Sequence, residues 1–219
     1  MKYFSLIMMV LAVFLLSGYE NQPKVLSNNE VKTSISSLDE LGAIADNEIA
    51  KNPRYKELTQ KSRNNNLSPK EKKELDDITS TLIINHSSGA LKKRDLSNYN
   101  ILTFDDKRCK KCKSAILICK EAAKDLGIEV VVINPAKFSS YVQQHNLPKN
   151  NLDVNFLLDA YSDEKFLERR MRSDGLAIFL EDRAHNKVDR FIDAFTDFNN
   201  KNSAKADLLT WLDLVLPKK

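Results

Sequence analysis

The seven residues 107–113 constrain this chain more than any other segment, because they place two cysteines, Cys109 and Cys112, among five cationic side chains. The mostly apolar residues 100–104 predict a strand before the pair, and apolar residues recur at helical spacing after it as far as Gly127, which predicts the helix end. A second strand is expected over residues 128–134. This layout puts a cysteine at a helix N-terminus, where the helix dipole favours the thiolate.

The residues around the pair resemble the thioredoxin superfamily, and in particular its periplasmic Dsb-type oxidases and isomerases. In that branch a strand end of the F-x-D type leads into C-x-x-C, as residues 103–106 lead into Cys109 here. Residues 126–131, which open the second strand, fit the same pattern. The resemblance covers residues 98–217 and implies an α/β, thioredoxin-like fold with a helical insertion.

The resemblance also implies a thiol–disulfide oxidoreductase. Whether it acts as an oxidase, an isomerase or a reductase stays open. Cys109, at the helix start, is expected to be the exposed nucleophile, and Cys112, one turn later, the resolving thiol. Arg108, Lys110 and Lys111 are expected to lower the thiolate pKa, which stabilises the reduced form and makes the disulfide more oxidising. No cofactor beyond this disulfide is expected, and the expected partners are proteins with thiols or disulfides and a redox partner protein.

The chain departs from the family opposite the dithiol. The family has a cis-proline there, at the substrate groove, and this chain has Gly175 or Leu176, with no proline between Pro148 and Pro217. General isomerase activity is therefore not implied. Thr103 stands where cytoplasmic thioredoxins keep a buried acid.

Other interpretations of the cysteine pair stay open. A zinc site needs about four ligands, but Cys119 lies too far along the helix, and the three histidines are dispersed, so no metal is expected. A permanent structural disulfide is a second alternative, although so short a loop adds little closure entropy. The lysines are alternatively a solvated face or a docking patch for an acidic partner. Cys119 is expected to be a core residue because it shares the apolar helix face.

Residues 1–18 have the pattern of a signal peptide, with a lysine at position 2 and an apolar run of about thirteen residues. The run ends like a lipoprotein signal with Tyr19 in place of the acceptor cysteine, so lipidation at Tyr19 is not expected. The predicted location is periplasmic or associated with the cell envelope, where a disulfide persists. The net charge of +4, or +3 once Lys2 is removed, is not typical of a nucleic-acid-binding protein.

The remaining chain is expected to form a polar tether (19–36), a small all-helical region (37–97) and the thioredoxin-like domain (98–219). In the helical region, a first helix is expected from residue 37 to about 50 and a second over about 54–61. Ser68 and Glu71 then predict a capping box, and a Ser-Ser-Gly sequence predicts a helix end near His86. By analogy with Dsb-type isomerases, a homodimer through residues 37–97 stays open, alongside a helical cap that only covers apolar surface.

Within the domain, the expected order is β-α-β-α-β-β-α, with the first two strands parallel because a helix connects them. A buried strand over residues 176–180 is followed by a hairpin and a return strand over 188–192, and Ser203 is expected to cap the last helix. Two functions follow from these patterns. The first is an exported thiol–disulfide oxidoreductase, and the alternative is a non-enzymatic thioredoxin-fold adaptor or assembly factor of an envelope or conjugative secretion system.

Overall fold

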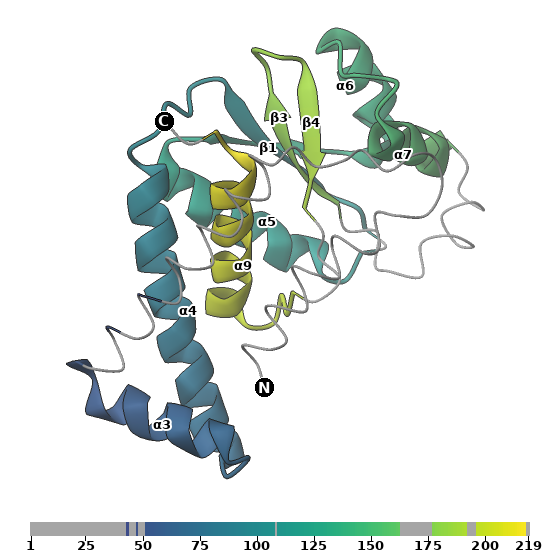
Figure 1. Ribbon diagram of the computed structural model, residues 1–219. Helices are drawn as coiled ribbons and strands as arrows, with labels where there is room; N and C mark the ends of the chain where they lie inside the picture. Colours follow the sequence, from purple (N-terminus) through teal and green to yellow (C-terminus); the bar gives the residue numbers. More distant parts are fainter. Residues whose placement is uncertain are drawn as a thin grey trace, which may run out of the picture. The chain divides into compact units, whose positions relative to one another are not determined.

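The computed structural model describes residues 51–107, 109–162, 177–191 and 196–217, together with Ala43 and Asn47 (Figure 1). The expected signal peptide, the tether and most of the first expected helix lie outside these residues. Contacts divide the chain into two compact units, Met1–Thr79 and Ser80–Lys219. This boundary falls inside helix α4, whereas the sequence pattern had placed one near residue 97. None of the described helices combines the length and apolarity that a membrane span requires.

Helix α4 (Pro69–Leu91) begins where the sequence predicts. The Ser68 backbone N–H donates to the Glu71 carboxylate over 3.0 Å, and the Glu71 N–H donates to the Ser68 hydroxyl oxygen over 3.3 Å. This reciprocal pair is a capping box, which satisfies backbone donors that a helix start leaves without partners. The Glu71 pKa is lowered to about 2, first because the Lys61 ammonium group hydrogen-bonds its carboxylate. The predicted capping box is confirmed.

Helix α3 (Pro53–Arg63) extends the helix expected over residues 54–61 by one residue before and two after. Arg54 donates to both carboxylate oxygens of Glu74 in α4, over 2.9 and 2.7 Å. Both side chains are about two-fifths exposed, at 41% and 38%. Such exposed pairs are screened by salt, so this bond orients α3 on the first half of α4 more than it stabilises the pair.

Helix α4 does not end near His86, and this prediction is wrong. The helix continues through Gly89 to Leu91, whose side chain is completely buried in the core. A glycine inside a helix costs about 1 kcal/mol relative to alanine. Burying a leucine side chain contributes about 1.5–3 kcal/mol. The tertiary contact of Leu91 therefore outweighs the local stop signal.

The second unit contains a four-stranded mixed sheet in the order β2-β1-β3-β4. Its strands are β1 (Tyr99–Phe104), β2 (Glu129–Ile133), β3 (Ile178–Asp182) and β4 (Lys187–Arg190). Strand β1 pairs with β2 in parallel and with β3 in antiparallel, and β3 pairs with β4 in antiparallel. The predicted parallel crossover and the predicted hairpin are both confirmed, as is the α/β class.

Helices cover both faces of this sheet (Figure 1). One core contains buried residues of β1, β3 and the helices α5 (Cys112–Leu126) and α9 (Lys201–Val215). The other contains residues of α6 (Phe138–Gln144) and α7 (Leu152–Ser162), which follow the short 3-10 helix η1 (Pro135–Lys137). These elements between β2 and β3 begin the expected helical insertion, whose continuation beyond Ser162 lies outside the described residues.

The two helices of the first face have different boundary signals. Helix α5 ends at Gly127, as predicted, and this glycine has the positive φ of 70° that L residues with a side chain rarely adopt. Helix α9 begins earlier than predicted, because its cap is Asn200. The Asn200 side-chain oxygen accepts the Ser203 N–H over 3.2 Å, so Ser203 lies in the first turn and is not the cap.

Candidate redox site

Cys109 and Cys112 form a disulfide, with their Cα atoms 5.4 Å apart. Both residues are buried, with 6% of the surface of Cys109 and 1% of that of Cys112 exposed. The expectation of an exposed Cys109 sulfur is therefore wrong in this oxidised state. Cys109 is still the more accessible of the two, which is the asymmetry that a nucleophilic and a resolving cysteine require.

Backbone hydrogen bonds place Cys109 between the sheet and the helix. The Asp105 N–H donates to the Ile133 carbonyl over 3.0 Å, so the β1–β2 ladder extends one residue past β1. The Cys109 N–H then donates to the Asp106 carbonyl over 3.0 Å, which closes a turn. The turn brings Cys109 back to the carboxyl end of β1, beside the first residue of α5.

The N-terminus of α5 has no side-chain cap. Cys112 is the first helical residue, and the side chain of Lys111, at the cap position, makes no capping hydrogen bond. The first N–H groups of a helix have no partner within the helix, and they carry the positive end of its dipole. A thiolate at Cys109 or Cys112 would be stabilised by these groups.

The structure describes most, but not all, of the basic side chains expected beside the disulfide. Lys107, Lys110, Lys111 and Lys113 are all exposed around the buried disulfide. Arg108, the third expected thiolate-tuning residue, lies outside the described residues. Gly175 and Leu176, expected at a substrate groove, also lie outside them, so the groove stays a prediction.

Cys119 is a core residue, as the sequence predicts. It is completely buried in the core between the sheet and α5 and α9, and it is not part of a disulfide. Burial raises its pKa to about 12, because desolvation disfavours the thiolate. At neutral pH Cys119 is therefore a protonated thiol without access to solvent.

Two polar residues beside the site are buried. Asp106 in the turn is 6% exposed, and Thr103 on β1 has no exposed surface. Strand alternation places Thr103 on the same face as Ile101, which packs in the core of α5 and α9. Among the described residues, the Thr103 hydroxyl has no hydrogen-bond partner. The sequence marked Thr103 through its place in the resemblance, but nothing in it indicated that Asp106 would be buried.

Within the described part of the chain, no three His, Cys, Asp or Glu side chains lie together as metal ligands would.

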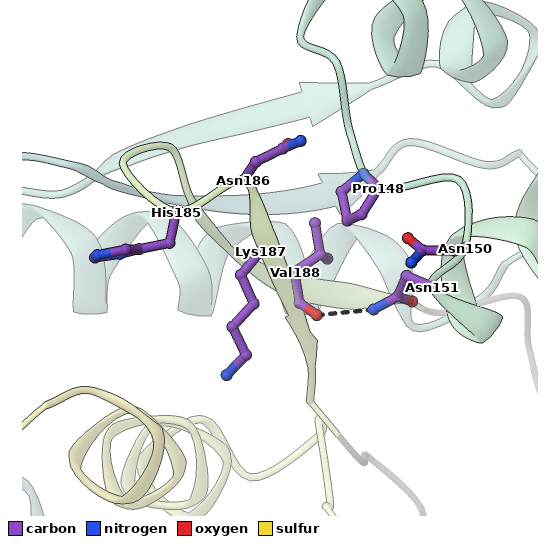
Figure 2. A pocket seen from close by; sticks show the side chains of 7 residues that line it. All are labelled: Pro148, Asn150, Asn151, His185, Asn186, Lys187 and Val188. Carbon is purple, nitrogen blue, oxygen red and sulfur yellow. Dashed lines mark hydrogen bonds between the residues drawn. The ribbon is translucent and has the colours of Figure 1, made fainter.

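A shallow hollow of about 410 Å³ lies away from the disulfide, where the loop before α7 meets the β3–β4 hairpin (Figure 2). Asn151 lines it and donates to the Val188 carbonyl over 3.1 Å, the dashed line in Figure 2. The hairpin follows Asp182, which pairs with Tyr99 at the start of β1, whereas the disulfide follows the end of β1. The hollow and the disulfide therefore lie at opposite ends of the sheet.

Comparison with protein families, with characterised proteins and with solved structures gives no match for this chain.

Proposed function

We propose that this protein is an exported thiol–disulfide oxidoreductase that exchanges disulfides with protein substrates through Cys109 and Cys112. The observation that carries the proposal is the disulfide at the uncapped N-terminus of α5, directly after the turn that follows β1. A helix start lowers the pKa of a cysteine, and the thiolate is the form that attacks disulfides. Structural bridges, in contrast, gain most where they close long loops.

The domain that carries this pair is proposed to be thioredoxin-like. In support, β1, α5 and β2 form a parallel crossover, and β3 and β4 form an antiparallel hairpin that joins β1 through β3. Helix α9 then packs on the same face as α5. This is the order of elements that the resemblance to the thioredoxin superfamily implies.

In the proposed mechanism, the reduced protein uses Cys109 as the nucleophile. Its thiolate attacks one sulfur of a substrate disulfide, which forms a mixed disulfide and releases the other substrate sulfur as a thiolate. The Cys112 thiol then loses its proton and attacks the Cys109 sulfur. This step releases the second substrate sulfur and leaves the protein disulfide. The reverse sequence oxidises a substrate dithiol, and a redox partner protein resets the pair in either direction.

A second candidate function is a non-enzymatic thioredoxin-fold adaptor or assembly factor of the cell envelope. The observation in its favour is the burial of both cysteines, since a bridge that only stabilises the fold needs no access to solvent. The periplasmic or envelope location belongs to both proposals and is supported by the N-terminal residues of the sequence alone.

The reduction potential of the pair tests the proposed function. We expect the full chain, equilibrated in glutathione redox buffers, to have a potential above that of thioredoxin, which is about −270 mV. We also expect a Cys109 pKa below the usual value of about 8.5, measured by thiolate absorbance of the reduced protein. A potential below about −300 mV with an unperturbed thiol would instead identify a structural bridge.

Reversing two charges beside the disulfide is expected to make it more reducing. In Lys110→Glu with Lys111→Glu, the added carboxylates destabilise the thiolate, so the reduced form loses stability and the potential falls. A tenfold change in this equilibrium is about 30 mV, and screening at exposed positions keeps the expected fall within about that range.

The same redox titration of Lys149→Glu with Lys187→Glu serves as the control. Both of these lysines are exposed and belong to the segments around the hollow, at the end of the sheet opposite the disulfide. This double variant changes the net charge by the same amount and is expected to leave the reduction potential of the disulfide unaltered. An equal potential in both double variants and in the unmodified chain contradicts the electrostatic role of Lys110 and Lys111.

A further inference from the structure

Helix α5 presents a narrow basic face to solvent. Its exposed residues at helical spacing are Lys113, Leu117, Lys120 and Lys124. At 3.6 residues per turn these four positions fall within about 60° of arc and span about 16 Å of the helix. We call this set the α5 stripe. The stripe begins one residue after Cys112, so it leads away from the disulfide along one side of the helix.

Among the residues that the structure describes, no carboxylate forms an ion pair with a lysine of the α5 stripe. The two carboxylates of α5, on Glu121 and Asp125, pair with Lys201 and Lys205 of α9, over 2.5 and 2.7 Å. The Lys205 ammonium group is also the main reason that the pKa of Asp125 is lowered. Both acids are thus engaged on the side of α5 that faces α9. Among the described residues, no ion pair reaches Lys113, Lys120 or Lys124.

Leu117 stands in the middle of these lysines with 61% of its surface exposed, more than any other large apolar residue of α5. A single exposed leucine is ordinary on a protein surface. This one, however, has Lys113 one turn before it, Lys120 one turn after it and Lys124 two turns after it, all on the same face. The stripe therefore offers one apolar contact between cationic groups.

We propose that the α5 stripe is the docking surface for the polypeptide that exchanges disulfides with Cys109 and Cys112. Its complement is a segment that carries a cysteine and, beside it, carboxylates on both sides of an apolar side chain. Opposite charge on the two surfaces raises the rate of encounter and sets the orientation of the bound segment. The inference rests on the proposed function, since it specifies the class of substrate for that same dithiol.

Three synthetic peptide disulfides test the proposal. Each is a homodimer linked through its single cysteine, and the residues around a leucine are glutamate in the first, glutamine in the second and lysine in the third. The reduced full-length protein is mixed with each disulfide, and the loss of protein dithiol is followed in time. Two electrons pass from the protein, which becomes the disulfide, to the peptide, which becomes two thiols.

We expect the glutamate peptide to react at least about tenfold faster than the glutamine peptide at low ionic strength, and the lysine peptide to react more slowly than both. Salt should narrow these differences in rate, because the charges are exposed.

The double variant Lys120→Glu with Lys124→Glu should remove the preference for the glutamate peptide. Lys120→Gln with Lys124→Gln should weaken it, and this second variant preserves the test if charge reversal near the helix end impairs folding. Lys149→Glu with Lys187→Glu, the charge-matched control, should retain the preference.

The outcomes separate the two proposals. Reaction with all three peptides at equal rates overturns the docking inference and leaves the oxidoreductase intact. A preference that the control variant removes to the same extent as the Lys120 and Lys124 variants reflects net charge and also overturns the inference. No reaction with any peptide disulfide overturns the proposed function itself. A further outcome would assign the α5 stripe to an anionic membrane surface instead. In that case the three peptides react at equal rates, and the protein sediments with phosphatidylglycerol vesicles unless Lys120 and Lys124 are replaced.

Discussion

Replacing Arg94 by alanine is expected to lower the free energy of unfolding by about 3–5 kcal/mol, the usual effect of removing one partner from a buried ion pair. The Arg94 side chain is only 9% exposed, and its guanidinium group forms an ion pair with the Asp213 carboxylate, which is 12% exposed. It also donates to the backbone carbonyls of Asp213 and Leu216, over 3.1 and 2.9 Å. Arg94 thus supplies donors for the C-terminal end of α9, where a helix has carbonyls without partners.

This loss is a large fraction of the free energy of unfolding, since a domain of this kind is stabilised by only about 5–15 kcal/mol in total. Urea denaturation, followed by circular dichroism, measures the effect on the full chain. A double-mutant cycle with Asp213→Ala separates the ion pair from the carbonyl contacts, since the carbonyls remain when the carboxylate is removed. Lys93→Ala, an exposed neighbour, is the matched control and is expected to change stability by less than about 0.5 kcal/mol. A cost below about 1 kcal/mol for Arg94→Ala contradicts the structural role assigned to it.

Replacing Cys112 by serine is expected to trap the substrate on the protein. In this variant Cys109 attacks a substrate disulfide, but no thiol is present at position 112 to release the mixed disulfide. Exchange should then stop after one event, whereas the unmodified chain completes it. A covalent complex that disappears on reduction should be seen by non-reducing gel electrophoresis and by mass spectrometry.

Two single variants make this result specific to the proposed roles. Cys109→Ser should give no complex, because the remaining residue at the site, Cys112, is the less exposed sulfur, at 1%. Cys119→Ala should exchange like the unmodified chain, since the Cys119 thiol is buried and its pKa is raised to about 12. If the complex forms equally through Cys109 and Cys112, the division into nucleophile and resolving thiol is wrong, although the pair still exchanges.

Much of the fold follows from short-range patterns. The start of α4 at Ser68 and the end of α5 at Gly127 agree with the predictions, because capping and positive φ depend on residues within one turn of each other. The strands were predicted from apolar runs, and their boundaries differ from the predictions by no more than a few residues. The spacing of Cys109 and Cys112 likewise brought them into one disulfide.

The features that were missed depend on residues far apart in the sequence. Glu181 follows an apolar run and gives no local sign of burial. In the structure it is 3% exposed and accepts hydrogen bonds from Asn100 and Tyr141, each over 3.1 Å. These partners lie on another strand and on α6. A buried carboxylate is tolerated only where such donors satisfy it, so its position could not be inferred from its neighbours in the chain.

The candidate site shows the same division. Sequence alone indicated two cysteines at the start of a helix, lysines around them and a third cysteine on the apolar face, because spacing and side-chain type decide these features. The burial of Cys109 and the pairing of Glu121 and Asp125 with α9 came from packing. Packing brings together side chains as far apart in the sequence as Arg94 and Asp213. The free energy of such contacts, as at Leu91, exceeds the local preference of a turn or a cap.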